Sequence, residues 1–116
     1  MVYDEEEQKC KSIEDKWEVL GKRWALLVLK NLHTKEPMRF NELKRALPGI
    51  SSTVLAARLL EMEREGLVSK KIYPEIPSRV EYRLTVSAKE LGVILKDLGE
   101  WAQNWRSPRI ASTKIQ

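Results

Sequence analysis

The chain has 116 residues, of which 42% are hydrophobic and 33% are charged, and it contains one cysteine. This length fits one domain, this hydrophobic content argues against a disordered chain, and one cysteine excludes an internal disulfide framework. The longest apolar run, Trp24 to Leu29, is much shorter than the roughly 18–20 residues that cross a membrane, and the N-terminus is acidic where a targeting peptide would be basic. We therefore expect a cytoplasmic domain that does not bind membranes.

The net charge of +4 is unevenly distributed along the chain. Residues 1–7 hold four acidic side chains and no lysine or arginine, so residues 8–116 carry 21 basic against 13 acidic side chains, a net charge of +8. A basic folded domain favours a polyanionic partner, most often nucleic acid. The alternative is a charged surface that serves only solubility.

Apolar residues recur at helical spacing through the first two thirds of the chain. A first helix has an apolar face made by Cys10, Ile13, Trp17 and Leu20. A second helix, from about residue 23 to 33, turns four apolar side chains inward: Trp24, Leu27, Val28 and Leu32. Asn41 is the predicted cap of a short third helix, which ends at Pro48-Gly49 and whose inward residues are Leu43, Ala46 and Leu47.

A fourth helix follows at once. It begins at a cap formed by Ser51 or Ser52 and runs to Glu65, where Gly66 supplies a left-handed C′ residue. Its predicted inward face consists of Leu55, Leu59 and Met62.

The apolar period then changes from 3.6 to 2, which predicts two strands over residues 67–73 and 79–85. Pro74 and Pro77 stiffen the connection, and a single-residue strand pairing is expected near Met38-Arg39. Ser87 to Glu90 forms a predicted capping box that opens a last helix, which continues to about residue 106.

The predicted order is therefore α-α-α-α-β-β-α. It indicates an α+β fold, mostly α: a winged helix-turn-helix with helices added at both ends. We divide the chain into an acidic N-terminal extension (1–9), a winged helix-turn-helix domain (10–106) and a polar C-terminal tail (107–116).

Several stretches resemble the HxlR-type family, a branch of the MarR-like winged-helix transcriptional regulators. They include GKRWALL (21–27), RFNEL (39–43), LPGIS (47–51) and, most specifically, the wing YPEIPSRVEY (73–82). The resemblance covers roughly residues 10–105 and implies a homodimeric, DNA-binding regulator of transcription. Two positions depart from the family pattern: Lys11 follows Cys10 where a proline is common, and Ser78 replaces the second proline of the wing tip.

In such a regulator the fourth helix, about 51–65, is the recognition helix, and its N-terminal half is free of acids. Hydroxyls and small residues at a helix start suit phosphate and base edges in the major groove, although the same residues are also ordinary caps and helix formers. The candidate DNA-binding residues here are Ser51, Ser52, Thr53, Ala56, Ala57 and Arg58.

The wing, about 67–85, adds basic residues for the backbone or the minor groove. These candidates are Lys70, Lys71 and Arg79, with Arg39 as a further phosphate contact ahead of the third helix. The alternative is a sheet edge protected from aggregation by lysine. A dimer with two such motifs would bind a pseudo-palindromic double-stranded operator.

The last helix carries an apolar seam that matches the one on the first helix. Together they exceed what a small winged-helix core can cover, so we predict a homodimer interface across a two-fold axis that contains Ile13, Trp17, Leu20, Leu91, Ile94, Leu98, Trp101 and Trp105.

Cys10, flanked by Lys9 and Lys11, is either a redox thiol that senses an oxidant or a small apolar residue of the seam. A small-molecule effector is a further candidate partner. The sequence shows no catalytic constellation, metal-ligand cluster or cofactor motif, so we predict neither an enzyme nor a cofactor. The rival hypothesis is a winged helix that docks proteins and binds no operator.

Overall fold

The computed structural model describes the backbone of residues 5–105 and the side chains of residues 13–105. The helices and strands follow in the predicted order. Their bounds are α1 Glu5–Leu20, α2 Ala25–Thr34, α3 Phe40–Ala46, α4 Ser52–Arg64, β1 Val68–Tyr73, β2 Arg79–Leu84 and α5 Val86–Asn104. The predicted C-terminal tail and the side chain of Cys10 lie outside the described residues.

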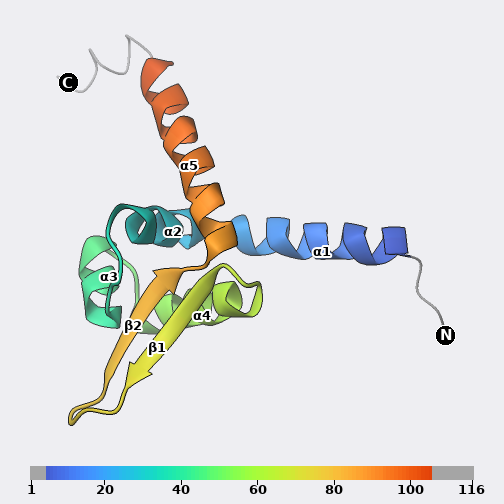
Figure 1. Ribbon diagram of the computed structural model, residues 1–116. Coiled ribbons are helices and arrows are strands. Elements are labelled where there is room, and N and C mark those ends of the chain that lie inside the picture. The colour runs from blue at the N-terminus through green and yellow to red at the C-terminus, as the bar shows by residue number, and fades with distance from the viewer. Residues whose placement is uncertain (1–4, 106–116) are drawn as a thin grey trace.

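The elements form a small core from which two helices project (Figure 1). Helices α2, α3 and α4 lie together with the base of the β1–β2 hairpin, whereas α1 and α5 extend away from them in different directions. The hairpin points away from the core on the side where α4 lies. This is the winged helix-turn-helix architecture that the sequence predicts.

The core consists of the facing sides of α2, α3, α4 and the base of the hairpin. The predicted inward residues of α4 are buried, as are Leu43 and Leu47. Two predictions are wrong: Leu27 is 45% exposed, and Ala46 is exposed. Because α2 begins only at Ala25, its buried stripe is shifted from the predicted one and consists of Ala25, Val28, Leu29 and Leu32.

Trp24, the residue before α2, has a left-handed backbone with φ of 79°. Its ring packs against the core and lies beside Gly49, which also has positive φ, 95°. A Cβ at Gly49 would lie 3.8 Å from the Trp24 ring. The turn between α3 and α4 is thus packed against the turn that precedes α2.

The ends of α4 agree with the sequence. The Val54 backbone N–H donates to Ser51 Oγ at 3.1 Å, and Gly66 is left-handed with φ of 72°. These two residues fix where α4 begins and ends.

Two other caps differ from the prediction. Asn41 lies inside α3, whose N-cap is Arg39; the Arg39 backbone N–H donates to Glu42 Oε1 at 2.9 Å. The N-cap of α5 is Thr85 rather than a residue of the Ser87 capping box: Thr85 Oγ1 accepts from the Ala88 N–H at 3.3 Å. The same hydroxyl donates to the Gly66 carbonyl at 2.6 Å, which joins the start of α5 to the end of α4.

The wing is an antiparallel hairpin with a register from Val68↔Leu84 to Tyr73↔Arg79. Met38 pairs with Tyr82 through two backbone hydrogen bonds of 3.1 and 2.8 Å, which confirms the expected pairing near this residue. The wing is therefore attached at its base to the segment that leads into α3.

Helix α5 leaves the core along α2. A Cβ at Gly92 would overlap the ring of His33, so this glycine permits the close approach of the two helices. Beyond that contact α5 continues away from the core (Figure 1). Among the described residues, no helix is long and apolar enough to cross a membrane.

Candidate nucleic-acid interface

The outer side of α4 is the first part of the candidate interface. The predicted hydroxyl and alanine residues are all exposed, at the N-terminus and on the outer side of this helix: Ser51, Ser52, Thr53, Ala56 and Ala57. Thr53, Ala56 and Ala57 lie away from the buried Leu55, Leu59 and Met62, whereas Ser51 and Ser52 lie at the N-terminal end of the helix. Short side chains on this face let another molecule approach the helix backbone closely.

Arg58, also predicted to bind DNA, is engaged within the chain. Its Nε donates to the Arg23 carbonyl at 2.9 Å, and its Nη1 donates to Glu61 Oε1 at 2.8 Å. Only 18% of its side chain is exposed. The structure therefore places Arg58 as a connection between α4 and the turn before α2.

Glu61 is the centre of this connection. Lys22 Nζ donates to Glu61 Oε2 at 2.7 Å, on the opposite side from Arg58. The hydrogen bond from Lys22, followed by that from Arg58, holds the pKa of the Glu61 carboxyl below its ordinary value. One turn later, Lys16 of α1 pairs with Glu65 at 3.5 Å. The acidic half of α4 is thus bound to α1 and to the turn that follows it.

The wing is the second part of the interface, and Arg79 dominates it. The Arg79 guanidinium lies 3.9 Å from the centre of the Tyr73 ring. It also pairs with Glu75 at 3.1 Å and, more loosely, with Glu81 at 3.7 Å. Sequence analysis missed these partners, although Glu81 lies two residues from Arg79 and so shares its face of the strand.

The wing lysines also lie near side chains of this chain. Lys71 Nζ is 4.9 Å from the centre of the Tyr73 ring, and Lys70 is 3.9 Å from Glu63 of α4. Both lysines are exposed, and their contacts are long. They remain accessible to a phosphate, in contrast to the more closely held Arg79.

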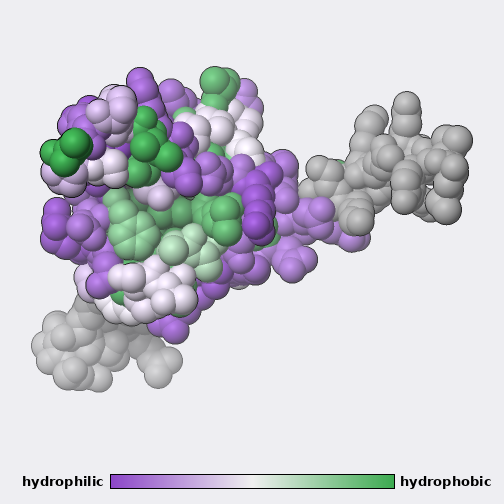
Figure 2. Space-filling view, turned by 90° about the horizontal axis from the view of Figure 1, so that it is seen from below, coloured by the Kyte–Doolittle hydropathy of each residue, from purple (hydrophilic) through white to green (hydrophobic). Residues whose placement is uncertain are grey.

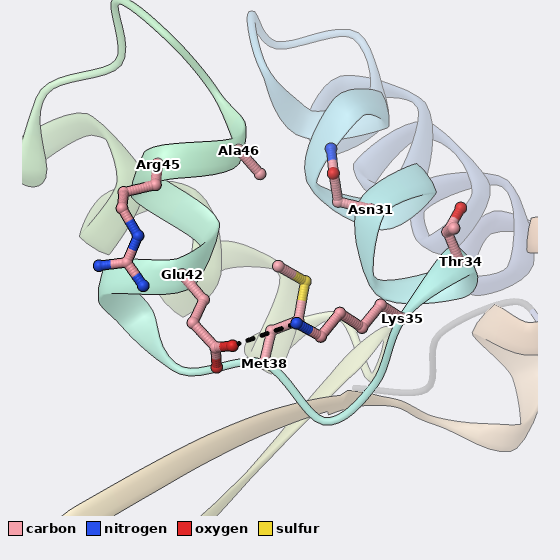
Figure 3. Close-up of a pocket in the computed structure, with 7 residues that line it drawn as sticks. All are labelled: Asn31, Thr34, Lys35, Met38, Glu42, Arg45 and Ala46. Atoms are coloured by element: carbon pink, nitrogen blue, oxygen red, sulfur yellow. Dashed lines mark hydrogen bonds and ion pairs between the residues drawn. The ribbon is translucent and has the colours of Figure 1, made fainter.

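Arg39, the predicted phosphate contact ahead of α3, is exposed at the N-cap of that helix. Beside it, Lys35 and Glu42 form an ion pair of 3.3 Å between the end of α2 and α3 (Figure 3). The backbone N–H of Arg39, followed by Lys35, lowers the pKa of the Glu42 carboxyl. These contacts orient the first helix of the helix-turn-helix against α2.

The same residues border a groove of about 380 Å³ between α2 and α3. Figure 3 shows its lining, with the sulfur of Met38 toward the floor and polar side chains around it. The lining residues are Asn31, Thr34, Lys35, Met38, Glu42, Arg45 and Ala46.

Seen from below the view of Figure 1, the surface is mostly hydrophilic, with separate hydrophobic areas between the polar side chains (Figure 2). Three large apolar side chains of α4 and the wing contribute to the exposed surface: Leu60, 46% exposed, Ile72, 61% exposed, and Ile76, fully exposed at the wing tip. Among residues 13–105, no group of His, Cys, Asp or Glu is arranged to hold a metal ion.

The predicted dimer seam is mostly uncovered in this chain. Trp17, Trp101 and Trp105 are 71, 61 and 77% exposed, and Ile13, Ile94 and Leu98 are exposed as well. Leu20 and Leu91 differ because they are partly buried and pack against the core of their own chain. The projecting parts of α1 and α5 therefore present large apolar side chains that this chain does not cover.

Comparison with known proteins places this architecture in a family. The model of the HxlR-like helix-turn-helix family matches residues 19–110. The chain is 41% identical over 102 residues to the uncharacterized HTH-type transcriptional regulator YvaP of Bacillus subtilis (strain 168), a match that covers 87% of this chain and 93% of YvaP. It is 34% identical over 99 residues to the HTH-type transcriptional regulator YodB of the same organism, covering 85 and 88% of the two chains.

Solved structures give the same result. The reduced form of YodB from B. subtilis aligns with a TM-score of 0.69 and 35% identity over 82% of this chain and 92% of YodB. The redox regulator HypR in its reduced form aligns with a TM-score of 0.76 and 29% identity over 85 and 97% of the two chains. These relatives are transcriptional regulators and not enzymes. By sequence and by fold, the chain belongs to the HxlR-like helix-turn-helix family of transcriptional regulators.

Proposed function

We propose that this chain regulates transcription by binding a specific double-stranded DNA operator as a homodimer. Helix α4 enters the major groove, and the wing lies on the backbone or in the adjacent minor groove. The observation that carries this proposal is the outer face of α4, where small and hydroxyl-bearing residues from Ser51 to Ala57 are exposed together beside the wing. A helix with such a face fits a major groove about 12 Å wide.

Electrostatics support the same orientation. The N-terminus of α4 has unpaired backbone N–H groups and a partial positive charge, which favour phosphate. The acids at its other end, Glu61 and Glu65, are occupied by Lys22 and Lys16 of this chain. The helix therefore offers its N-terminal half to DNA and keeps its acidic half against its own domain.

The direct test is selection of bound sequences from a pool of random duplexes, followed by titration of the selected operator and a scrambled duplex at several salt concentrations. We expect two half-sites with centres about 10–11 base pairs apart, because a dimer presents two α4 helices to successive major grooves. Affinity for both duplexes should fall steeply with salt. A protein that enriches no sequence and binds no duplex would instead support a protein-docking winged helix.

The homodimer is proposed from the exposed seam of α1 and α5. Trp101→Glu would place an unpaired charge in that seam and should separate the dimer at micromolar concentration in sedimentation experiments. Gln103→Glu is the matched control, because it also adds one negative charge, at an exposed position of the same helix outside the seam. A Trp101→Glu protein that sediments as a full dimer would contradict the assignment.

We also propose that the Cys10 thiol senses an oxidant. Cys10 belongs to α1, one of the two proposed dimer helices, and lysines flank it in the sequence. Of the structural relatives, YodB has been solved reduced and diamide-treated, and HypR reduced and oxidized. Cys10→Ser should bind the operator as the reduced wild type does, and only the wild type should release it after diamide treatment. Identical responses of both proteins to diamide would exclude sensing by this thiol.

A further inference from the structure

We infer that α4 reads thymine methyl groups in the operator, with Leu60 as the largest apolar contact, rather than guanines through arginine. The inference rests on the proposed function, since it concerns which bases the α4 face recognises. It assigns Leu60 a role in sequence specificity.

The first half of α4 has no free basic side chain to donate hydrogen bonds to bases. The commonest specific contact in the major groove is an arginine or lysine that donates to guanine O6 and N7. Arg58 is the only basic residue between Ser51 and Leu60, and two of its nitrogens already donate to the Arg23 carbonyl and to Glu61. What remains on the outer face of this half of α4 is hydroxyl, methyl and isobutyl groups.

Thr53, Ala56, Ala57 and Leu60 recur at helical spacing on the exposed side of α4. Leu60 is 46% exposed, although its neighbour Leu59 is almost completely buried. Thr53 and Leu60 are seven residues apart, which is about 10 Å along the helix axis. This apolar stripe is long enough to follow about three base pairs at 3.4 Å each.

Arg64 lies one turn beyond Leu60. It is exposed, but it lies in the last turn of α4, whose neighbouring residues include Glu61, Glu63 and Glu65. The three acids are paired with Lys22, Lys70 and Lys16, and these pairs hold this end of α4 against α1, the turn that follows α1, and the wing. Arg64 therefore lies at the end of α4 farthest from the N-terminal half that we orient toward the groove. Leu60 is thus the last residue of the outer face that precedes the acidic end.

The chemistry of the groove then specifies the base. In the major groove only thymine presents a methyl group, at C5, and apolar side chains contact it. We therefore expect each half-site to contain thymines beneath α4, and the contribution of each to depend on its methyl rather than on its hydrogen-bonding atoms.

Replacing single thymidines of the selected operator with deoxyuridine removes only this methyl. At the thymines beneath α4, the wild type should bind the deoxyuridine operator about three- to ten-fold more weakly. Leu60→Ala should bind the unmodified operator more weakly and should lose the deoxyuridine penalty at one position. Val86→Ala, which also truncates an exposed apolar side chain, is the matched control and should keep the full penalty.

The converse substitution tests the arginine alternative. Replacing guanines by 7-deazaguanine removes the N7 acceptor, and we expect less than a two-fold effect beneath α4 in the wild type and in Arg64→Gln. Deoxyuridine operators bound as tightly as the unmodified one, an unchanged penalty in Leu60→Ala, or a large 7-deazaguanine effect that Arg64→Gln abolishes would each overturn the inference. Binding of the unmodified operator is measured in the same titration, so loss of the proposed function itself is recognised by the absence of that binding.

Discussion

Helix α4 and the wing face the same side of the molecule but present different chemistry. The outer face of α4 is small and uncharged in its first half, and its one arginine there is held by the chain itself. The wing strands and their connection carry four basic residues, yet Arg79 and Arg83 both share the carboxylate of Glu81. A count of basic residues therefore overstates the positive charge that the wing offers to DNA.

In the proposed function, α4 and the wing have different roles in DNA binding. If the proposal holds, the face of α4 discriminates by shape and methyl contacts, and its fit to the groove tolerates little change. The wing would then provide a moderated attraction for phosphate. Substitutions on the two elements should accordingly differ in size and in dependence on sequence.

The largest effect is expected for Ala57→Glu. A longer, negatively charged side chain at the centre of the α4 face would meet phosphates and base edges, so operator affinity should fall more than about 100-fold. Glu63→Ala removes an acid from the other end of the same helix and should bind as well as the wild type or better. Filter-binding or anisotropy titration measures both. Unchanged affinity in Ala57→Glu would mean that α4 does not enter the groove.

A smaller and less specific effect is expected for Arg79→Ala. The change removes the cation that stacks on Tyr73 and leaves Glu75 and Glu81 without this partner, so binding should weaken about ten-fold for operator and scrambled duplex alike. The dependence of log affinity on log salt should become shallower by about one if one phosphate contact is lost. Arg79→Lys, which keeps the charge, should lie between the two proteins. A loss confined to the operator, with an unchanged salt slope, would assign Arg79 to base reading.

Glu81→Gln is expected to strengthen DNA binding, in contrast to the two preceding substitutions. Removing this carboxylate releases Arg79 and Arg83 from a shared partner and adds one positive charge to the wing. Binding to both duplexes should strengthen about three-fold at low salt, and the gain should decline as salt rises. Glu100→Gln changes the net charge equally on α5 and serves as the control. Equal gains in the two variants would show that only net charge matters.

The smallest effect concerns the attachment of α4 to its own domain. Glu61→Gln should lower the free energy of unfolding by about 0.5–1 kcal/mol at pH 7, because it weakens the contacts with Lys22 and Arg58. The pKa of Glu61 lies below 4.5 in the folded chain, so its contribution is complete above that pH and disappears as pH falls through the folded value. Urea unfolding at pH 7 and at a series of lower pH values should show a difference between wild type and variant that is largest at pH 7 and shrinks as pH falls below 4.5. A difference that stays constant over the whole series would show that packing, not charge, stabilises this contact.

Much of the fold follows from local sequence patterns. The limits of α4 were predictable because a serine cap, a 3.6-residue apolar period and a terminal glycine agree, and the wing because its period changes to two. The caps of α3 and α5 were not, since several polar residues compete there and the choice depends on distant contacts. Thr85, for instance, is held by the Gly66 carbonyl, 19 residues away in the chain.

The site was predictable in outline and not in its electrostatics. Sequence patterning finds the exposed face of α4 because the buried face is periodic. It does not reveal that Arg58 donates to a carbonyl 35 residues earlier, nor that Arg79 stacks on Tyr73. Both are tertiary contacts, and they determine which cations remain available.

The left-handed Trp24 beside the left-handed Gly49 has a consequence for how the family can vary. A large residue with positive φ costs of order 1–3 kcal/mol, which the packing of its indole against the core and the turn must offset. Glycine at position 24 would remove the backbone strain, but it would also remove the indole that packs beside the turn before α4. A side chain at position 49 would be strained at its own φ of 95°, but its Cβ, 3.8 Å from the indole, would make only ordinary van der Waals contact with it. Each position is therefore constrained by its own left-handed backbone, and we expect redesigns of either turn to keep a residue that tolerates this conformation.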